Sequence, residues 1–205
     1  MVREQANPTA PRSSAASAWA EEAATASVVA LVEGPSDAAA LTTLAQRHGR
    51  NLATEGVLVV PIGGATNIGH HLQVLTGAHP QLRVAGLCDA DEERAYRRGL
   101  ERAGLCVSAT RERMKDLGFY VCDQDLEDEL IRSLGARAVL EVFDQAGTLE
   151  KFHLYQRQPA HRRETLEEQL RGFVTNEKRR YARLFIGALD LHRVPGPLAG
   201  LLAHI

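Results

Sequence analysis

The sequence has few cysteines and no pairing pattern among them. Its three thiols, Cys88, Cys106 and Cys122, form no Cys-x-x-Cys pair, so a structural zinc site is not expected. An odd number of thiols without framework spacing suits a reducing compartment, and we therefore expect a cytoplasmic protein. Cys88 and Cys122 lie in apolar runs and are expected to be small buried hydrophobes.

Long hydrophobic runs and targeting signals are also missing. No segment approaches the roughly 20 apolar residues of a membrane-spanning helix. The first residues show no basic stretch followed by an apolar one, so a secretory signal peptide is not expected. We accordingly expect no membrane partner.

Charge of one sign is not in excess. The formal net charge is −2, so the chain as a whole is not a basic nucleic-acid binder. A length of 205 residues with 44% hydrophobic and 24% charged residues is ordinary for one globular domain with at most a small appendage. Most of the 24 basic residues are arginines, many of them within 94–113 and 157–183. Arginine favours bidentate contact with phosphate, but it is also a common residue of solvated helix faces.

The alternation of apolar runs and turn residues predicts an α/β fold. The Ala-, Ser- and Pro-rich N-terminus predicts a flexible leader over residues 1–26. Residues 27–134 predict a Rossmann-like, mostly parallel four-stranded sheet flanked by helices. Residues 135–205 show helical spacing without a convincing strand, which predicts a C-terminal helical extension packed on or beside the sheet. The expected strands are 28–32, 57–62, 83–88 and 119–122.

Turn residues mark the helices between these strands. Ser36 is expected to cap a helix over 37–48, and Asp91 is expected to cap the helix after the third strand. Residues 105–118 show no regular pattern. Thr165-Leu-Glu-Glu has the spacing of a capping box.

Acidic residues follow three of the four expected strands. They are Glu33 and Asp37 after the first strand, Asp89 and Asp91 after the third, and Asp123, Asp125 and Glu127 after the fourth. Because the carboxyl ends of parallel strands meet at one edge, these carboxylates would repel one another unless a cation lay among them. Oxygen ligands suit Mg²⁺ or Mn²⁺, and two such ions about 3.5–4 Å apart would hold the attacking and leaving oxygens of a phosphodiester.

Helix capping is the competing explanation for part of this set. Asp37, Asp91 and Asp125 stand where caps and first-turn acids are common, and for any one of them this explanation has at least equal weight. It is weaker for Glu33 and Asp89, which no expected helix needs as a cap. The coincidence of three strand ends favours a metal site.

Three segments together resemble a known domain. They are Val-Val-Ala-Leu-Val-Glu-Gly-Pro-Ser-Asp, Val-Val-Pro-Ile-Gly-Gly-Ala-Thr-Asn and Gly-Leu-Cys-Asp-Ala-Asp. They resemble the Toprim domain shared by topoisomerases, bacterial primases and certain nucleases. With the later Asp-Leu-Glu-Asp-Glu-Leu, the sequence is most similar to the nuclease domain of the OLD (overcoming lysogenization defect) family over about residues 27–134.

The resemblance implies metal-dependent cleavage of DNA with two Mg²⁺ or Mn²⁺ ions. Carried over by motif, the first acidic cluster is Glu33, Asp37, Asp89 and Asp91, and the later one is Asp125 and Glu127. Glu33 is then a general base or a metal ligand, and sequence does not separate these roles. The family also implies a downstream basic residue for the transition-state phosphate. Lys178 is our candidate, and a solvated helix-face lysine is the equally weighted alternative.

OLD proteins carry an ATPase domain before the Toprim domain, and this sequence has no Gly-x-x-x-x-Gly-Lys-Ser/Thr motif. A separate ATPase subunit is therefore an expected possible partner. A non-catalytic Toprim module that binds nucleic acid or such an ATPase is the alternative to the nuclease. A topoisomerase would need a nucleophilic tyrosine, for which Tyr181 is the one candidate, without other support.

Weaker signals remain open. Gly63-Gly64 either lets backbone N–H groups approach phosphate or forms a tight turn with positive φ, and the turn is favoured for at least one of them. Adjacent His70 and His71 point in different directions on a helix and are rejected as a joint metal site. Arg94, Arg97 and Arg98 on one expected helix are candidate nucleic-acid contacts, with a solvated face as the more common explanation.

Overall fold

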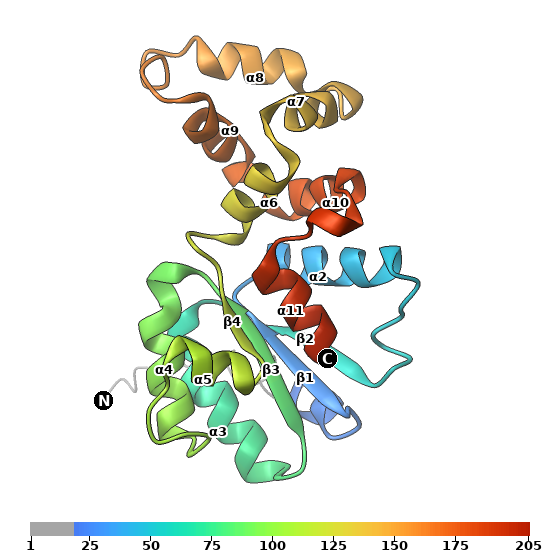
Figure 1. Ribbon diagram of the computed structural model, residues 1–205, viewed down its shortest axis with the longest axis vertical. Helices are drawn as coiled ribbons and strands as arrows, with labels where there is room; N and C mark the ends of the chain where they lie inside the picture. Colours follow the sequence, from blue (N-terminus) through green and yellow to red (C-terminus); the bar gives the residue numbers. More distant parts are fainter. Residues whose placement is uncertain (1–18) are drawn as a thin grey trace, which may run out of the picture.

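The computed structural model describes residues 19–205, and it is built around a four-stranded, all-parallel sheet (Figure 1). The sheet order is β2-β1-β3-β4, which confirms the α/β architecture expected from the sequence. The strands are β1 (Val28–Val32), β2 (Val57–Pro61), β3 (Arg83–Cys88) and β4 (Phe119–Val121). All five residues of β1 are buried, as a central strand covered on both faces requires.

One face of the sheet is covered by three helices. These are α3 (Ile68–Ala78), α4 (Glu93–Arg102) and α5 (Arg111–Asp116). Leu31 and Phe119 from the sheet meet Tyr96 and Leu100 of α4 in a buried cluster on this side. Residues 105–118, where no regular pattern was expected, contain α5, which begins where Thr110 accepts a hydrogen bond from the Arg113 N–H.

The opposite face is covered by helices from both ends of the chain. Helix α2 (Pro35–Arg47) and the C-terminal helix α11 (Gly196–His204) lie on this face, and α10 (Lys178–Ala188) packs along α2. Helix α11 contacts β3 and β4, so the last residues of the chain complete the core of the sheet. The sequence did not predict α11, because its Gly- and Leu-rich residues carry no capping signal or polar face.

The helical extension stands over the carboxyl ends of the strands (Figure 1). It contains α6 (Leu126–Leu134), α7 (Ala136–Gln145), α8 (Leu149–Gln156) and α9 (Leu166–Val174). The Phe143 ring lies at its centre, with ring centroids of Phe152 and Tyr181 each 5.2 Å away. The same buried cluster continues into the sheet face under α2, so the extension and the sheet share one core. Within residues 19–205 there are also four 3₁₀ turns: η1 (Ala65–Asn67), η2 (Ala90–Glu92), η3 (Thr175–Glu177) and η4 (Leu191–Arg193).

Two expected helix starts are wrong by a few residues. Helix α2 begins after Gly34 rather than Ser36, because Pro35 suits the first helical position and the Asp37 carboxylate accepts the Gly34 N–H at 2.8 Å. Asp91 does not cap α4, because a 3₁₀ turn precedes that helix and Glu92 takes the cap position. The Thr165 capping box is confirmed, with the Glu168 carboxylate accepting the Thr165 N–H at 2.7 Å.

The expected flexible leader falls mainly outside the described residues, which begin at Trp19. Residues 19–23 are helical, Trp19 stacks on His71 with ring centroids 4.6 Å apart, and Ala23 is buried. These last residues of the expected leader therefore pack against the sheet domain, because they bring apolar surface to α3. Among the described residues, no helix is both long enough and apolar enough to cross a bilayer.

Close packing of β3 between β1 and β4 predicts the effect of one substitution. A Cβ at Gly86 would lie 2.8 Å from the Leu31 carbonyl oxygen and 2.9 Å from the Phe119 ring. Gly86→Ala should therefore lower the free energy of unfolding by about 1–3 kcal/mol, measured by urea denaturation. Gly77→Ala in α3 meets no atom within 4 Å and should be neutral or stabilise by about 0.5–1 kcal/mol. Equal effects of the two changes would contradict this account of the sheet.

Candidate functional site

The acidic side chains meet at the carboxyl edge of the sheet because its central strands end level with one another. Val32 pairs with Leu87, so Glu33 and Asp89 leave adjacent strands within one or two residues of the same level. The turn after β2 holds Glu33 in place, since the N–H groups of Gly63 and Gly64 both donate to the Glu33 carbonyl. Both glycines have positive φ, which confirms the turn interpretation and leaves these N–H groups engaged.

Glu33 carries an unsatisfied oxygen inside the protein. Its Oε2 is buried and has no hydrogen-bond partner among the described residues. Burial raises the pKa of Glu33, and the carboxylates of Glu92 and Glu127 add to the rise while Lys178 opposes it. A buried acid without a partner is costly, so this oxygen marks a place where a proton, a cation or a donor is needed.

Asp37 and Asp89 are perturbed in the same direction. Burial raises the pKa of Asp37 to about 7, against the lowering effect of the hydrogen bond from Gly34. Burial raises the pKa of Asp89 to about 8, with further contributions from Asp37 and Glu33. Glu33 adds to the rise in the pKa of both Asp37 and Asp89, and Asp37 adds to that of Asp89, so these three carboxylates share one electrostatic environment.

An open pocket of about 390 Å³ lies at this edge. Its lining includes Glu33, Asp89, Asp91, Asp123, Asp125 and Arg171. Asp91 is exposed, whereas Asp89 is half-buried deeper in the pocket. Acids from three strand ends therefore line one pocket, whereas Asp37 and Glu127 are not part of its described lining.

The later acidic pair lies on the first turn of α6 and is held by cations from the helical extension. Asp125 is the N-cap residue of α6, and its carboxylate accepts the Asp128 N–H at 2.8 Å. Helix capping, the alternative to metal binding for this residue, is therefore a role that it does fill. Its Oδ2 also accepts from Arg171 Nη2 at 2.5 Å and Nε at 3.0 Å. Glu127 is buried, and Lys178 Nζ donates to its Oε2 at 3.0 Å.

The contact with Glu127 distinguishes Lys178 from a freely solvated lysine. Lys178 opens α10 and is half-buried, so folding of the extension brings it to the acids over 51 residues of sequence. Arg171, which lines the pocket, was not identified from the sequence. No motif surrounds it, and its approach depends on how α9 packs beside α6.

The arginines expected to contact nucleic acid lie elsewhere. Arg94, Arg97 and Arg98 are on α4, and none of them lines the acidic pocket. The Arg97 guanidinium donates to the Ala109 carbonyl and lies 3.6 Å from Glu93, which gives it a structural role. Arg94 and Arg98 are exposed, and their part in nucleic-acid binding stays a prediction.

Tyr181 is a core residue in the structure. It is buried, and its hydroxyl donates to Thr148 Oγ1 at 3.1 Å inside the helical extension. A covalent strand-transfer nucleophile must reach a phosphodiester, so this position gives no support to a topoisomerase.

The donor set fits a hard divalent cation, although the side chains are not gathered into a ligand shell. The pocket offers carboxylate oxygens of the kind that Mg²⁺ and Mn²⁺ accept, including the unpartnered Glu33 oxygen. Within residues 19–205, no group of three or more His, Cys, Asp or Glu side chains is close enough to hold a metal ion as it stands. Like charges separate, and Lys178 and Arg171 draw Glu127 and Asp125 toward the extension. Ligation would require these side chains to turn inward.

Comparisons with known proteins bear on this parallel sheet and its acidic carboxyl edge. Residues 25–91 match the family model described as "Overcoming lysogenization defect protein-like, TOPRIM domain". Over these residues the chain is similar to the Toprim domain of OLD proteins. Toprim domains generally bind divalent metal ions, and the match indicates nuclease- or primase-type chemistry in broad terms.

Solved structures show the same fold. The C-terminal region of the Xanthomonas campestris pv. campestris OLD protein is 22% identical with a TM-score of 0.67, over 90% of this chain and 94% of that one. The C-terminal region of the Burkholderia pseudomallei OLD protein is 20% identical with a TM-score of 0.61, over 87% and 96% respectively. At this identity the likeness shows the fold alone. No curated protein matches the sequence.

The raised pKa values predict how stability changes with pH when divalent ions are removed by EDTA. The folded protein holds protons on Asp37 and Asp89 up to pH values of about 7 and about 8, whereas the unfolded chain releases them near the ordinary value of 3.8. Between these limits the folded state binds more protons, so the free energy of unfolding falls as pH rises. The melting temperature should therefore drop between about pH 5 and pH 9.

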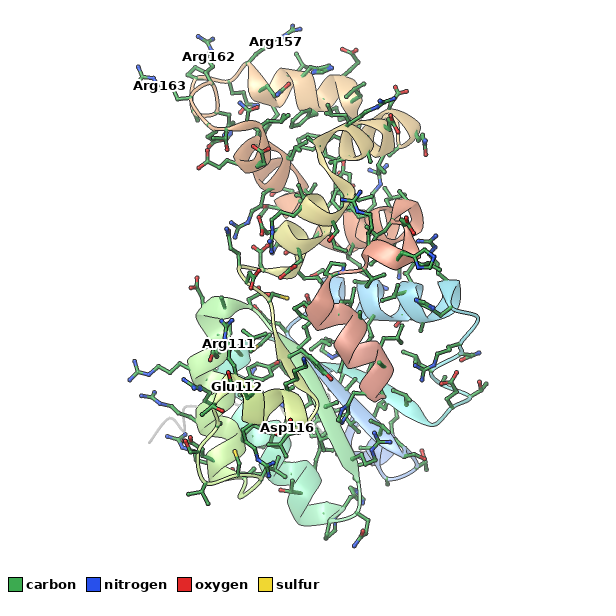
Figure 2. All side chains as sticks on the ribbon, viewed as in Figure 1. Arg111, Glu112, Asp116, Arg157, Arg162 and Arg163 are labelled. Atoms are coloured by element: carbon green, nitrogen blue, oxygen red, sulfur yellow. The ribbon has the colours of Figure 1, made fainter. Side chains whose placement is uncertain are left out.

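The variant Asp89→Asn should flatten this drop, because it removes one of the two titrations. Asp116→Asn on the exposed surface of α5 is the control and should follow the wild-type profile (Figure 2). A wild-type melting temperature that rises over this interval, or an unchanged slope in Asp89→Asn, would contradict the assignment.

Proposed function

We propose that this protein is a Mg²⁺- or Mn²⁺-dependent nuclease that hydrolyses phosphodiester bonds in DNA by a two-metal Toprim mechanism. The observation that carries this proposal is the buried Glu33 oxygen that has no hydrogen-bond partner among the described residues. Glu33 and Asp89 follow the carboxyl ends of the adjacent central strands β1 and β3. Such an arrangement destabilises the folded protein and serves no packing purpose, which is typical of a functional site.

The two acidic clusters divide the ligands between two ions. Glu33, Asp37, Asp89 and Asp91 would hold one ion, and Asp125 and Glu127 would contribute to the second. Ions held by these residues would supply a water molecule of lowered pKa and positive charge beside the scissile phosphate. The half-buried position of Asp89 keeps its carboxylate in a low-dielectric environment, where each charge interaction is stronger than in water.

Glu33 has two compatible roles in this reaction. As a ligand it supplies the oxygen that lacks a protein donor. As a general base it accepts a proton from the attacking water, and its raised pKa makes it a better acceptor than an ordinary glutamate. Both roles require the carboxylate.

Lys178 is proposed to bind the phosphate in the transition state. It reaches Glu127 from α10, and its charge acts on Glu33 and Asp89, so a change of its side chain would bring the ammonium toward a phosphate bound at the acidic edge. A preorganised cation in a partly buried site stabilises developing negative charge more strongly than one in water.

The first experiment is cleavage of supercoiled plasmid DNA across a titration of Mg²⁺ and Mn²⁺. Wild type should nick or degrade the plasmid, and Glu33→Gln and Asp89→Asn should each lose about 100-fold or more in rate, because each removes a charged ligand or base. Glu141→Gln, an exposed site on α7, is the control and should cleave normally. Absence of cleavage at every metal concentration, or full activity of both site variants, would overturn the proposal. Calorimetry that shows metal binding without turnover would support the non-catalytic module instead.

The role of Lys178 is tested by a conservative and a disruptive change. Lys178→Met should lower kcat by about 10²–10³-fold with little change in KM, because the cation acts on the transition state. Lys178→Arg should recover part of the rate, and Lys151→Met on the exposed face of α8 should have no effect. A loss confined to KM, or no loss at all, would remove Lys178 from the chemistry.

A further inference from the structure

A groove of about 660 Å³ runs between α2 and α10. Helix α2 covers one face of the sheet, and the arginines of α4 lie on the other. Its walls carry Thr42 and Gln46 from α2 and Arg179 and Arg183 from α10. The two helices lie side by side in Figure 1 and make extensive contact. The groove is thus a fixed feature of the interface between the sheet domain and the extension.

One end of the groove opens at the acidic edge. Pro35 and Pro61 line that end. Pro61 pairs with Val32, the residue before Glu33, and Pro35 lies two residues before Asp37. A chain bound in the groove would therefore run toward the acidic edge of the sheet.

The cations that line the groove are free to bind an anion. Arg179 and Arg183 are exposed, and neither has a carboxylate within 4.0 Å among residues 19–205. Their neighbours are engaged: Lys178 pairs with Glu127, and Arg180 pairs with Glu177 at 2.8 Å. No acidic residue is part of the described lining of the groove, so the groove presents two positive charges and no negative one.

The spacing of the two arginines favours a ligand with repeated negative charges. Residues four apart on a helix lie on the same face, and like charges at this spacing repel one another. They are separated by about 6 Å along the helix axis, close to two of the roughly 3.4 Å axial steps between phosphates of one DNA strand. Guanidinium groups also match phosphate geometry better than ammonium groups do.

The walls of the groove are held together without the ligand. Arg47, at the end of α2, donates through Nη1 to the Ile186 carbonyl at 2.7 Å and also to the Leu189 carbonyl. Ala182 and Ile186 of α10 are buried in the shared core. The arginine side chains therefore project from a rigid helix, which lowers the entropic cost of binding.

From these contacts we propose that the groove between α2 and α10 binds the sugar–phosphate backbone of DNA and guides it to the acidic edge. Arg179 and Arg183 each contact one phosphate, while Thr42 and Gln46 supply neutral polar contacts. This binding carries no base readout, so it is independent of sequence. The inference rests on the proposed function for the choice of DNA as the ligand.

The test measures DNA binding in EDTA, where cleavage does not occur, by fluorescence anisotropy of a labelled duplex over a series of salt concentrations. The double variant R179A/R183A should raise Kd about 10-fold or more at physiological salt. It should also reduce the slope of log K against log salt by about 1.8, since each phosphate contact contributes about 0.9. R179K/R183K should retain most of the slope.

The matched control is R157A/R163A, which removes the same charge from the exposed connection between α8 and α9, far from the acidic edge (Figure 2). It should change Kd by less than about 2-fold, because a distant charge makes no phosphate contact. Thermal melting of both double variants should match wild type, since all four side chains are exposed.

The outcomes separate this proposal from the nuclease itself. Wild type is assayed for plasmid cleavage in parallel, so a protein that binds DNA through the groove in EDTA but never cleaves keeps the inference and rejects the nuclease. An unchanged Kd and salt slope in R179A/R183A, or an equal loss in the control, would overturn the groove. Displacement of DNA by an acidic peptide at lower concentration than by unlabelled duplex would also overturn it, in favour of a protein ligand.

Discussion

Repulsion among carboxylates at one edge of the sheet is the constraint on which the site depends. The parallel order β2-β1-β3-β4 ends its central strands together, so Glu33 and Asp89 emerge side by side. Burial then makes their ionisation costly, and the Glu33 carboxylate further raises the pKa of Asp89. A fold that served only packing would place apolar or capping residues here. The buried acids instead lower the stability of the folded protein, as is usual at a site that binds positive charge.

The helical extension supplies cations that reduce this repulsion, and it connects the site to the rest of the molecule. Lys178 and Arg171 neutralise Glu127 and Asp125 from α10 and α9. They can do so because α10 packs on α2, and α2 begins at the same edge with Asp37 in its first turn. Helix α11 then covers β3 and β4, so the core of the sheet is incomplete without the end of the chain. Site and stability therefore depend on the same long-range packing.

Local sequence patterns explain which parts of this structure were predictable. Buried strands are short, continuous apolar runs, so β1 and β3 were placed to the residue, and the acids that follow them were found at once. Helices α8 and α11 were missed because they lack strong caps and regular polar faces. Arg171 was missed for another reason: its meeting with Asp125 spans 46 residues and depends on tertiary packing alone. The spacing of residues in the sequence predicts which of them share a helix or strand. It does not predict contacts between residues on two elements that are distant in the sequence.

The same distinction decides which arginines are suited to bind an anion. Helix α4 carries several arginines close together in the sequence. However, Arg97 contacts the Ala109 carbonyl and Glu93, and none of the α4 arginines lines the acidic pocket. Arg179 and Arg183 are no more conspicuous in the sequence, but α10 sets them beside α2, where no described acid competes for them. A net charge of −2 is therefore compatible with a local positive track, because the acids are confined to the pocket and the free guanidinium groups to the groove beside it. Local potential at the site, more than the total charge, decides whether a polyanion is drawn toward such an edge.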